Sequence, residues 1–600
     1  MVSWDGLRLE AAKAARGLLD LDLGVGDRIA ILGPTHIEWT VYDLAGHLLG
    51  LVTLGVYPRQ SAEQIRFLLE NSGARVIFVA EEHELEVVLE AAEGIETLEA
   101  IVPWYDDLAE RFEARDSRIV PPATFRGDPL DMETSKEILA KVQPEDTAIL
   151  VYTSGTTGHP KGAMITHANI LAVMRSAPDI FPFHQDDVAM AFLPMAHVTE
   201  RVLSFYVRLE TGMPTAYATA IGSVLEEVAE VRPTIFGSVP RIFEKAHARV
   251  FSEMGKKPAA VQALFRWALG IGHQCAQLQL ADQPIPWTLE LRRRLAHALV
   301  FKKIQAAFGG RVRACITGAA PISEDILEFF WAIGMPIFEG YGQTEATVIT
   351  HITRFGAVKL GTVGPVIPPM ECRIADDGEV LLKGPFVFAG YWKNEDATRS
   401  TVVDGWLHSG DIGELDDEGF LRITDRKKHL IITAGGKNLA PANIERAIKS
   451  QSPLISQIHV HGDRRPYVSA ILAPSPLDTL AWGRTRGLID AREFETLEKE
   501  LLANPTARSE ALVQAMAQVT REPDFRQLFV DPVNAGNQQL ARVERVRRFV
   551  VLDRDFSQEA GELTPTMKMR RKELEANHAD LLESIYTDEP GGESGVMEAQ

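Results

Sequence analysis

The sequence has few cysteines and few basic residues for its length. Its 600 residues include three cysteines, 62 Lys and Arg, and 83 Asp and Glu, which gives a formal net charge of −21. Cys275, Cys315 and Cys372 are too few for a disulfide scaffold and too far apart for a C-x-x-C metal or redox motif. The acidic balance argues against a nucleic-acid partner, which would require basic residues to neutralise phosphates. Because the chain has so few cysteines, we expect a reducing, cytoplasmic compartment.

Long apolar runs are also missing. The longest, Leu44 to Tyr57, is interrupted by His47 and several glycines, and falls short of the ~20 apolar residues of a membrane-spanning helix. The first residues, M-V-S-W-D, are neither basic nor followed by an apolar stretch, unlike a secretory signal. We expect no transmembrane or targeting segment. Peripheral membrane contact and a homodimer stay open.

The hydrophobic pattern predicts an α/β fold. Hydrophobic residues make up 46% of the chain and charged residues 24%, which is typical of a soluble globular protein. Up to about residue 340, short apolar runs rich in β-branched residues alternate with helical patterns, as in buried parallel strands covered by helices. The expected strands are 28–32, 75–80, 147–152, 234–239 and 312–317, and the expected helices include 168–176 and 322–333.

The pattern changes after about residue 355. The turn sequences D-D-G at 376–378 and D-D-E-G at 416–419 lie between strand-like runs and predict a small antiparallel region over 361–424. A basic connector at 424–429 leads into a smaller α+β unit, with expected strands at 430–433, 455–460 and 468–472. Residues 588–600 are rich in Gly and Glu with almost no large apolar side chain, and are expected to be disordered.

The most informative segment is 152–162, Y-T-S-G-T-T-G-H-P-K-G, which follows an expected strand. Its glycines let backbone N–H groups turn towards an anion, its hydroxyls add donors, and Lys161 adds a positive charge. The spacing does not match the G-x-x-x-x-G-K-[ST] phosphate loop. The segment therefore predicts a polyphosphate-binding loop of another kind.

Together with four further motifs, this loop resembles the adenylate-forming (ANL) superfamily of acyl-CoA synthetases, adenylation domains and luciferases. The motifs are F-E-G-Y-G-Q-T-E at 338–345, G-W-L-H-S-G-D at 405–411, D-R-K-K at 425–428 running to G-G-K at 435–437, and L-T-P-T-M-K at 563–568. The resemblance covers nearly the whole chain. It implies a large N-terminal adenylate-forming domain of several subdomains and a smaller, mobile α+β C-terminal lid domain. The implied limits are 1–424 with a β region at about 356–424, a hinge at 425–428, the lid domain at 429–587, and an acidic tail at 588–600.

Several segments are most similar to long-chain fatty acyl-CoA synthetases. They are L-P-M-A-H-V-T-E-R at 193–201, S-V-P-R-I-F-E-K at 238–245, the helical stretch 264–303 and the ending 563–572. The resemblance implies an AMP-forming ligase that activates a medium-to-long-chain fatty acid with ATP through an acyl-adenylate. Transfer to CoA would then give acyl-CoA, AMP and pyrophosphate. The implied cofactor is Mg²⁺, a hard cation that suits carboxylate and phosphate oxygens.

The resemblance also assigns the site. Lys568, Thr344 and Glu345 would act in catalysis, with Glu345 as the Mg²⁺ ligand, His197 as the wall of the acyl pocket, Lys437 on the CoA side, and Asp425 and Lys428 in the hinge. The residues implied to bind ATP and AMP are Thr153, Ser154, Gly155, Thr156, Thr157, Gly158, Lys161, Gly318, Ala319, Ala320, Glu339, Gly340, Tyr341, Gly342, Asp411 and Arg426.

Simpler structural interpretations stand beside these roles. Outside its motif Asp411 would be a turn residue, Tyr341 a core residue, His197 a structural histidine, and Lys568 part of a solvated basic run. The sequence also departs from the family pattern at His429, where an acidic residue is common. At its beginning, Trp4 matches a position that normally lies some tens of residues into the family's proteins. An acyl-AMP ligase that loads a carrier protein, an aryl or short-chain acid ligase, and a silent nucleotide-binding regulator stay as alternatives.

Overall fold

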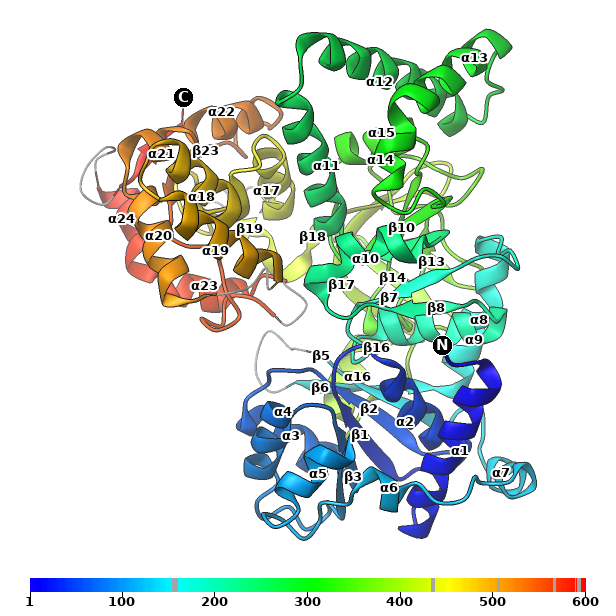
Figure 1. Ribbon diagram of the computed structural model, residues 1–600. Coiled ribbons are helices and arrows are strands. Elements are labelled where there is room, and N and C mark those ends of the chain that lie inside the picture. The colour runs from blue at the N-terminus through cyan, green and yellow to red at the C-terminus, as the bar shows by residue number, and fades with distance from the viewer. Residues whose placement is uncertain are drawn as a thin grey trace.

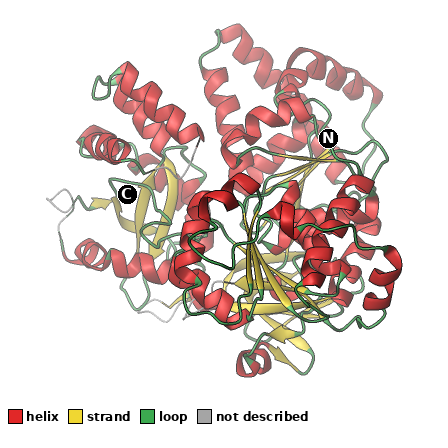
Figure 2. Ribbon diagram, turned by 60° about the horizontal axis from the view of Figure 1, so that its bottom comes forward, coloured by secondary structure: helices red, strands yellow, loops and turns green. Residues whose placement is uncertain are grey.

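The computed structural model describes seven stretches of the chain: 1–153, 160–432, 438–503, 508–564, 568–588, 590 and 595–599. Figure 1 shows two helix-covered sheets and a small antiparallel region in the N-terminal part, and a C-terminal unit beside α11. Helices (red) lie on both sides of the strands (yellow) in the large part of the molecule (Figure 2). The predicted α/β class with a smaller second unit is confirmed.

The first sheet has seven strands in the order β15-β6-β5-β2-β1-β3-β4. The five strands β5, β2, β1, β3 and β4 are parallel, and β6 and β15 join antiparallel. The strands are β1 Arg28–Leu32, β2 Val52–Val56, β3 Val76–Val79, β4 Ala100–Pro103, β5 Thr147–Thr153, β6 Lys161–Thr166 and β15 Gly390–Tyr391. Its helices are α1 Trp4–Asp20, α2 Ile37–Leu48, α3 Ala62–Ser72, α4 Glu82–Ala91, α5 Asp106–Phe112, α6 Pro122–Phe125, α7 Met132–Leu139 and α8 His167–Ile180.

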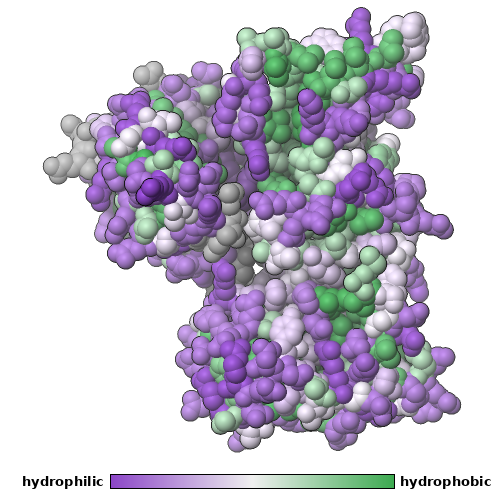
Figure 3. All heavy atoms as spheres, viewed as in Figure 1, coloured by the Kyte–Doolittle hydropathy of each residue, from purple (hydrophilic) through white to green (hydrophobic). Residues whose placement is uncertain are grey.

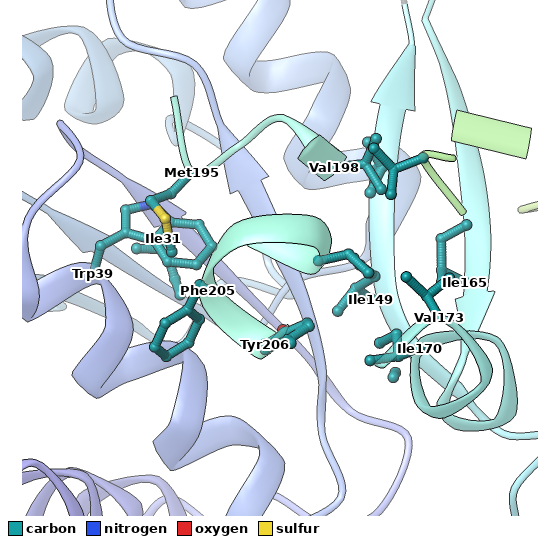
Figure 4. Close-up of a cluster of buried hydrophobic side chains, with 14 of the residues drawn as sticks. Ile31, Trp39, Ile149, Ile165, Ile170, Val173, Met195, Val198, Phe205 and Tyr206 are labelled. Carbon is teal, nitrogen blue, oxygen red and sulfur yellow. The ribbon is translucent and has the colours of Figure 1, made fainter. Parts of the chain in front are cut away.

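The core behind β5 and β6 fixes the two strands that flank the predicted phosphate loop. Ile149 of β5 and Ile165 of β6 are fully buried, and both belong to the same hydrophobic cluster as Trp39 of α2. Figure 4 shows side chains of this cluster on the two strands, on α8 and on η1, a π-helix over Thr199–Tyr206. Burying large apolar side chains of this kind stabilises each by about 1.5–3 kcal/mol, so the ends of β5 and β6 have a rigid support.

A buried ion pair ties η1 to α2, a helix that covers the first sheet. Arg201 contacts the carboxylate of Asp43, and both side chains are almost completely buried. The Tyr206 hydroxyl donates to the same carboxylate at 2.7 Å. One residue earlier in the 193–201 motif, Glu200 pairs with Arg208 at 2.8 Å. The acidic and basic residues of this motif therefore hold the fold, since a buried charge needs a partner.

The second sheet has six strands in the order β12-β11-β10-β9-β7-β8, all parallel except β12. The strands are β7 Ala189–Ala191, β8 Thr215–Tyr217, β9 Ile235–Ser238, β10 Ala314–Gly318, β11 Ile337–Tyr341 and β12 His351–Ile352. The associated helices are α9 Val207–Thr211, η2 Ile221–Ser223, α10 Val224–Val231, α11 Pro240–Gly255, α12 Ala259–Leu280, α13 Trp287–Ala296, η3 His297–Phe301, α14 Lys302–Ala306, α15 Glu324–Ala332 and η4 Thr344–Ala346.

The turn sequences at 376–378 and 416–419 connect antiparallel strands, as predicted. This sheet consists of β13 Glu371–Ile374, β14 Glu379–Lys383, β16 Val402–Val403, β17 Trp406–Leu415 and β18 Leu421–Arg426, with α16 Glu395–Thr401 beside it. Leu421 belongs to a hydrophobic cluster of the large part, whereas Ile431 belongs to one of the C-terminal part. The core thus changes across the predicted hinge, 425–428.

The C-terminal part has a four-stranded sheet in the order β21-β22-β23-β24, covered by helices. Its elements are η5 Lys427–His429, β19 Ile431–Ile432, β20 Asn438–Leu439, α17 Pro441–Lys449, β21 Ile455–His461, β22 Val468–Pro474, α18 Pro476–Thr485, α19 Ala491–Ala503, α20 Glu510–Thr520, α21 Pro523–Gln527, α22 Val530–Gln538, β23 Val546–Val551, α23 Arg571–Asn577, α24 Ala579–Thr587 and β24 Met597–Glu598.

The expectation of a disordered tail at 588–600 does not hold for residues 595–599. Phe549 of β23 lies opposite Met597 in an antiparallel ladder, and Val596 is fully buried. The composition argument overlooked this short apolar pair, because a strand edge nearby supplies the hydrogen-bond partners that the tail lacks by itself.

Candidate active site

The predicted phosphate loop connects two paired strands. Thr153 at the end of β5 lies opposite Lys161 at the start of β6, and its hydroxyl donates to the Lys161 carbonyl at 3.5 Å. The Lys161 ammonium lies 5.1 Å from the ring centroid of Tyr391. The predicted loop residues Ser154 to Gly158 lie outside the described residues, so the structure places only the two ends of this loop.

The ends of β10 and β11 approach each other closely. Gly318 and Gly340 are paired in register, and a Cβ at Gly318 would lie 2.8 Å from the Gly340 carbonyl oxygen. A Cβ at Gly342 would lie 2.2 Å from the Val348 carbonyl oxygen. Ala319, before Ala320, has a φ of +68°, a left-handed conformation that a non-glycine residue rarely adopts. Glycine is therefore required by the backbone at two predicted nucleotide-binding positions.

Glu345 is held by a residue that the sequence motifs did not indicate. It lies in η4 directly after Thr344, and its Oε1 accepts a hydrogen bond of 2.6 Å from the Tyr391 hydroxyl. Tyr391 belongs to β15, which pairs with β6. The same tyrosine thus contacts both Glu345 and Lys161, the predicted metal ligand and the predicted phosphate ligand.

Asp411 connects two other predicted nucleotide ligands. Tyr341 at the end of β11 donates its hydroxyl to Asp411 Oδ2 at 2.7 Å, and Arg426 Nε lies 2.8 Å from Oδ1. Asp411 and Arg426 lie opposite each other in the β17–β18 ladder, and the Asp411 side chain is buried. Burial, with the nearby carboxylate, raises the pKa of Tyr341 well above its usual value, so its hydroxyl keeps its proton. The arrangement is a continuous polar chain across three strands.

Lys568 brings the C-terminal part to this site. Its backbone N–H donates to Thr564 Oγ1 at 3.0 Å. The residue is exposed, yet the protein atoms around its ammonium lower its pKa by desolvation. Arg426 lowers this pKa further, whereas Asp411 and Glu345 raise it.

His197 lies close enough to Lys568 for the ammonium to influence it. Burial first, and the Lys568 charge second, lower the pKa of His197 to about 4. His197 Nδ1 accepts a hydrogen bond from the Thr199 N–H at 3.2 Å. The imidazole is therefore neutral near pH 7, which fits a residue that lines the acyl pocket and takes no part in proton transfer.

Glu339 carries the most perturbed carboxyl group of the nucleotide motif. Burial raises its pKa to about 8, Glu324 adds to the rise, and Arg446 of α17 opposes it. Its backbone N–H donates to Thr353 Oγ1 at 2.8 Å. A second residue of the C-terminal part thus acts electrostatically on the β11 end of the site.

Replacing Glu339 with glutamine is expected to change the pH dependence of stability. The folded carboxyl keeps its proton up to about pH 8, whereas an unfolded one loses it near pH 4.5, so wild-type stability falls as pH rises between these values. Glu339→Gln lacks this loss and should gain on the order of 2 kcal/mol relative to wild type between pH 5 and 8. Thermal unfolding at several pH values measures it, with Glu137→Gln, an exposed residue of α7, as control. Parallel profiles for wild type and Glu339→Gln would contradict the assigned protonation.

The predicted hinge residues contact the start of the C-terminal part. Asp425 is buried, and its carboxylate accepts from the Arg426 N–H at 2.6 Å and from the Ala442 N–H, in the first turn of α17, at 2.9 Å. Lys428 lies in η5, where desolvation and Arg426 lower its pKa. Lys437, predicted for the CoA side, lies outside the described residues.

One further ion pair that was not predicted joins the two parts, and another lies within the C-terminal part. Lys449 of α17 lies 3.2 Å from Glu244 of α11. Glu445 and Arg571 form a bidentate pair at 2.6 Å beside the hinge. Glu244 lies in the 238–245 segment and Arg571 in the ending 563–572, but neither pairing could be predicted from those segments, because the partners lie on different helices.

Comparisons with known proteins agree along the whole chain. A model described as AMP-binding enzyme matches residues 1–392, and one described as AMP-binding enzyme C-terminal domain matches 428–487. The long-chain-fatty-acid–CoA ligase FadD15 of Mycobacterium tuberculosis is 33% identical over 96% of this chain and 90% of its own length. The long-chain-fatty-acid–CoA ligase ACSBG2 of Xenopus laevis is 30% identical over 96% of this chain and 78% of its own.

A solved structure supports the fold. The adenylation domain of a carboxylate reductase from Mycobacterium chelonae has a TM-score of 0.69 and 23% sequence identity, and the match covers 97% of this chain and 84% of that domain. Among the described residues, the helices are too short or too polar for any to cross a membrane.

Proposed function

Because the chain belongs to the AMP-binding enzyme family, as its motifs predicted, we propose that it is an AMP-forming long-chain fatty acid–CoA ligase. The first half-reaction would join the acid to AMP and release pyrophosphate. The second would transfer the acyl group to the CoA thiol and release AMP. Both relatives are named long-chain-fatty-acid–CoA ligases, and the matches cover 90% and 78% of their own lengths, which supports this substrate class.

The observation that carries the proposal is the convergence of five distant segments. Lys568 interacts electrostatically with Glu345, Asp411 and Arg426, and it also acts on His197. A carboxylate attacking the α-phosphorus of ATP accumulates negative charge on the phosphate oxygens. A fixed ammonium there stabilises the transition state more than the ground state, which is how such a residue accelerates a reaction.

The donors around Glu345 fit a Mg²⁺ ion shared with the phosphates. Mg²⁺ is usually bound by one or two carboxylates together with phosphate oxygens and waters. Glu345 supplies one carboxylate, which Tyr391 orients, and Lys161 stands beside the same tyrosine. When bound, the ion would neutralise polyphosphate charge. Glu345 would hold it, and Lys161 would add a second positive charge.

The polar chain of Tyr341, Asp411 and Arg426 suits the nucleoside part of ATP. A carboxylate has about four lone-pair directions, so Asp411 can accept from ribose hydroxyls in addition to Tyr341 and Arg426. Gly318 and Gly340 lie opposite each other at the ends of β10 and β11 and add no side chains next to Tyr341, so we assign the adenine ring to this place. We assign these residues to ATP and AMP binding in both half-reactions.

CoA is the favoured acyl acceptor. Between η4 and β13 the described chain forms only one short strand, β12, and no additional helix. The family resemblance implies that acyl-AMP ligases that serve carrier proteins carry an extra insertion in the large domain, and no insertion is obvious near residues 345 to 375. Rotation at residues 425–428 would withdraw Lys568 and admit CoA, since a few residues at the end of an element can absorb a large change of φ and ψ.

A product assay tests the proposed function. Purified protein is incubated with ATP, Mg²⁺ and a mixture of short- to long-chain acids, with and without CoA, and the products are identified by mass spectrometry. We expect acyl-CoA and AMP only when CoA is present, with medium-to-long chains dominating. Acyl-AMP that accumulates regardless of CoA would identify a carrier-protein ligase, and no product from any acid would contradict the enzyme assignment.

A further inference from the structure

A stripe of large apolar side chains lies exposed along α13 and η3. Trp287, Leu291, Leu295 and Leu299 recur every four residues, and 79%, 63%, 52% and 45% of their surfaces are exposed. We call these four residues the α13 stripe. Residues four apart lie on the same side of a helix, so the four side chains form one continuous band.

The α13 stripe is not the side that α13 uses for packing. Ala296 is the buried residue of α13, and Leu289 packs against the hydrophobic cluster of the second sheet. Single exposed leucines are ordinary on a protein surface, but a contiguous exposed apolar band marks a site where another protein or a membrane binds.

The neighbouring helices extend the apolar surface. Phe251 near the end of α11 and Val261, Leu264 and Trp267 in the first half of α12 are each between 36% and 42% exposed. The Phe251 ring contacts buried Phe265 of α12. In Figure 3, hydrophobic residues (green) gather at the top of the molecule, where Figure 1 labels α12 and α13.

The charge of this region is opposite to that of the whole protein. Residues 249–303 contain nine Lys and Arg and three Asp and Glu, a net charge of +6, although the chain carries −21. Arg292 and Arg294 flank the α13 stripe, Lys302 and Lys303 follow it, and all four are exposed. A positive surface on an otherwise acidic protein attracts a negatively charged partner and orients the molecule towards it.

We propose that the α13 stripe and its basic flanks dock this protein on an anionic lipid bilayer. A helix with Trp and Leu on one face and Arg and Lys beside them lies in the plane of the membrane interface, with its apolar face among the acyl chains. Trp287 at the start of the helix suits the headgroup level. Each Lys or Arg near an anionic lipid surface adds electrostatic attraction to it.

A lipid surface fits these features better than a protein partner does. Four exposed aliphatic or aromatic side chains with arginines on both sides would place several charged groups, including the Arg294–Glu290 ion pair, in a protein interface, whose core is normally depleted of charge. The docking surface is inferred without using the ligase activity. If the proposed function holds, this surface would also bring the enzyme to long-chain acids that are dissolved in the bilayer.

Vesicle sedimentation of the full-length protein tests the proposal. Wild type is mixed with phosphatidylcholine vesicles with and without phosphatidylglycerol, and is compared with Leu291→Gln/Leu295→Gln and Arg292→Gln/Arg294→Gln. The matched control is Leu9→Gln/Leu528→Gln, which changes two leucines exposed elsewhere by 42% and 38%. Circular dichroism and adenylation of soluble octanoate without vesicles show that each variant is folded.

We expect binding only to the anionic vesicles, and a loss of at least about tenfold in affinity for the leucine variant but not for its control. The arginine variant should lose the preference for phosphatidylglycerol. Equal binding by the wild type and the leucine variant, or no vesicle binding at all, would overturn the proposal. A concentration-dependent dimer that the leucine variant abolishes, without vesicle binding, would assign the surface to a second copy instead. A wild type that adenylates none of the acids in the product assay would contradict the proposed function and leave the vesicle result unaffected.

Discussion

Lys568→Ala is expected to lower adenylation of the free acid by about 100- to 1000-fold, which is the usual effect of removing one preorganised charge donor from a transition state. The ammonium acts among Glu345, Asp411 and Arg426, where negative charge would build during attack on the α-phosphorus. Thioester formation from supplied acyl-AMP should stay within a few-fold of wild type, because that half-reaction needs no charge at this position. The two rates are measured separately, by pyrophosphate release from ATP that depends on the free acid, and by acyl-CoA formation from supplied acyl-AMP and CoA.

A neighbouring lysine provides the control for this experiment. Lys572 lies four residues later, is exposed, and belongs to the same basic run. Lys572→Ala should leave adenylation nearly unchanged, which separates a specific role of Lys568 from the general charge of the run. An equal loss of both half-reactions in Lys568→Ala would contradict the assigned role and point to a structural function for the 563–568 loop.

The parallel strands of the large part were predictable because their signal is local. Buried strands in such sheets are short apolar runs, and 28–32 and 147–152 were found with errors of at most one residue. Hairpins were equally visible, because Asp and Gly mark the turn at 376–378. Which strands become neighbours was not predictable from such signals. β15 joins β6 across more than 220 residues, and no local pattern in G-Y at 390–391 indicates it.

The site residues, too, were only partly predictable from the sequence. Motifs identified Asp411, Tyr341 and Lys568, but their mutual contacts depend on three-dimensional placement that no spacing encodes. Tyr391 illustrates the limit: it orients Glu345 and faces Lys161, yet in the sequence it is one tyrosine in a short apolar run. The perturbed pKa of Glu339 also required the structure, because burial, the largest cause, cannot be read from the residue itself.

The second large effect is expected for Asp411→Asn, which should weaken both half-reactions rather than one. The substitution keeps the shape of the side chain but removes the charge that holds Arg426 at 2.8 Å and accepts the Tyr341 hydroxyl at 2.7 Å. Weakening two charge-assisted hydrogen bonds, each worth about 1.5–3 kcal/mol, should lower kcat/KM for ATP by about 100-fold. AMP binding, measured by calorimetry, should weaken similarly, because the ribose is common to ATP and AMP.

Deoxynucleotides decide whether this effect comes from ribose recognition or from loss of structure. If Asp411 accepts the ribose hydroxyls, wild type should discriminate strongly between ATP and 2′,3′-dideoxy-ATP, and Asp411→Asn should discriminate far less. A site built to bind hydroxyls rejects the analogue that lacks them, because its own polar groups are then left without partners. Asp417→Asn, in the exposed turn before β18, is the matched control and should behave as wild type. If Asp411→Asn keeps the full discrimination and only lowers thermal stability, Asp411 serves the β17–β18 ladder and the ribose contact lies elsewhere.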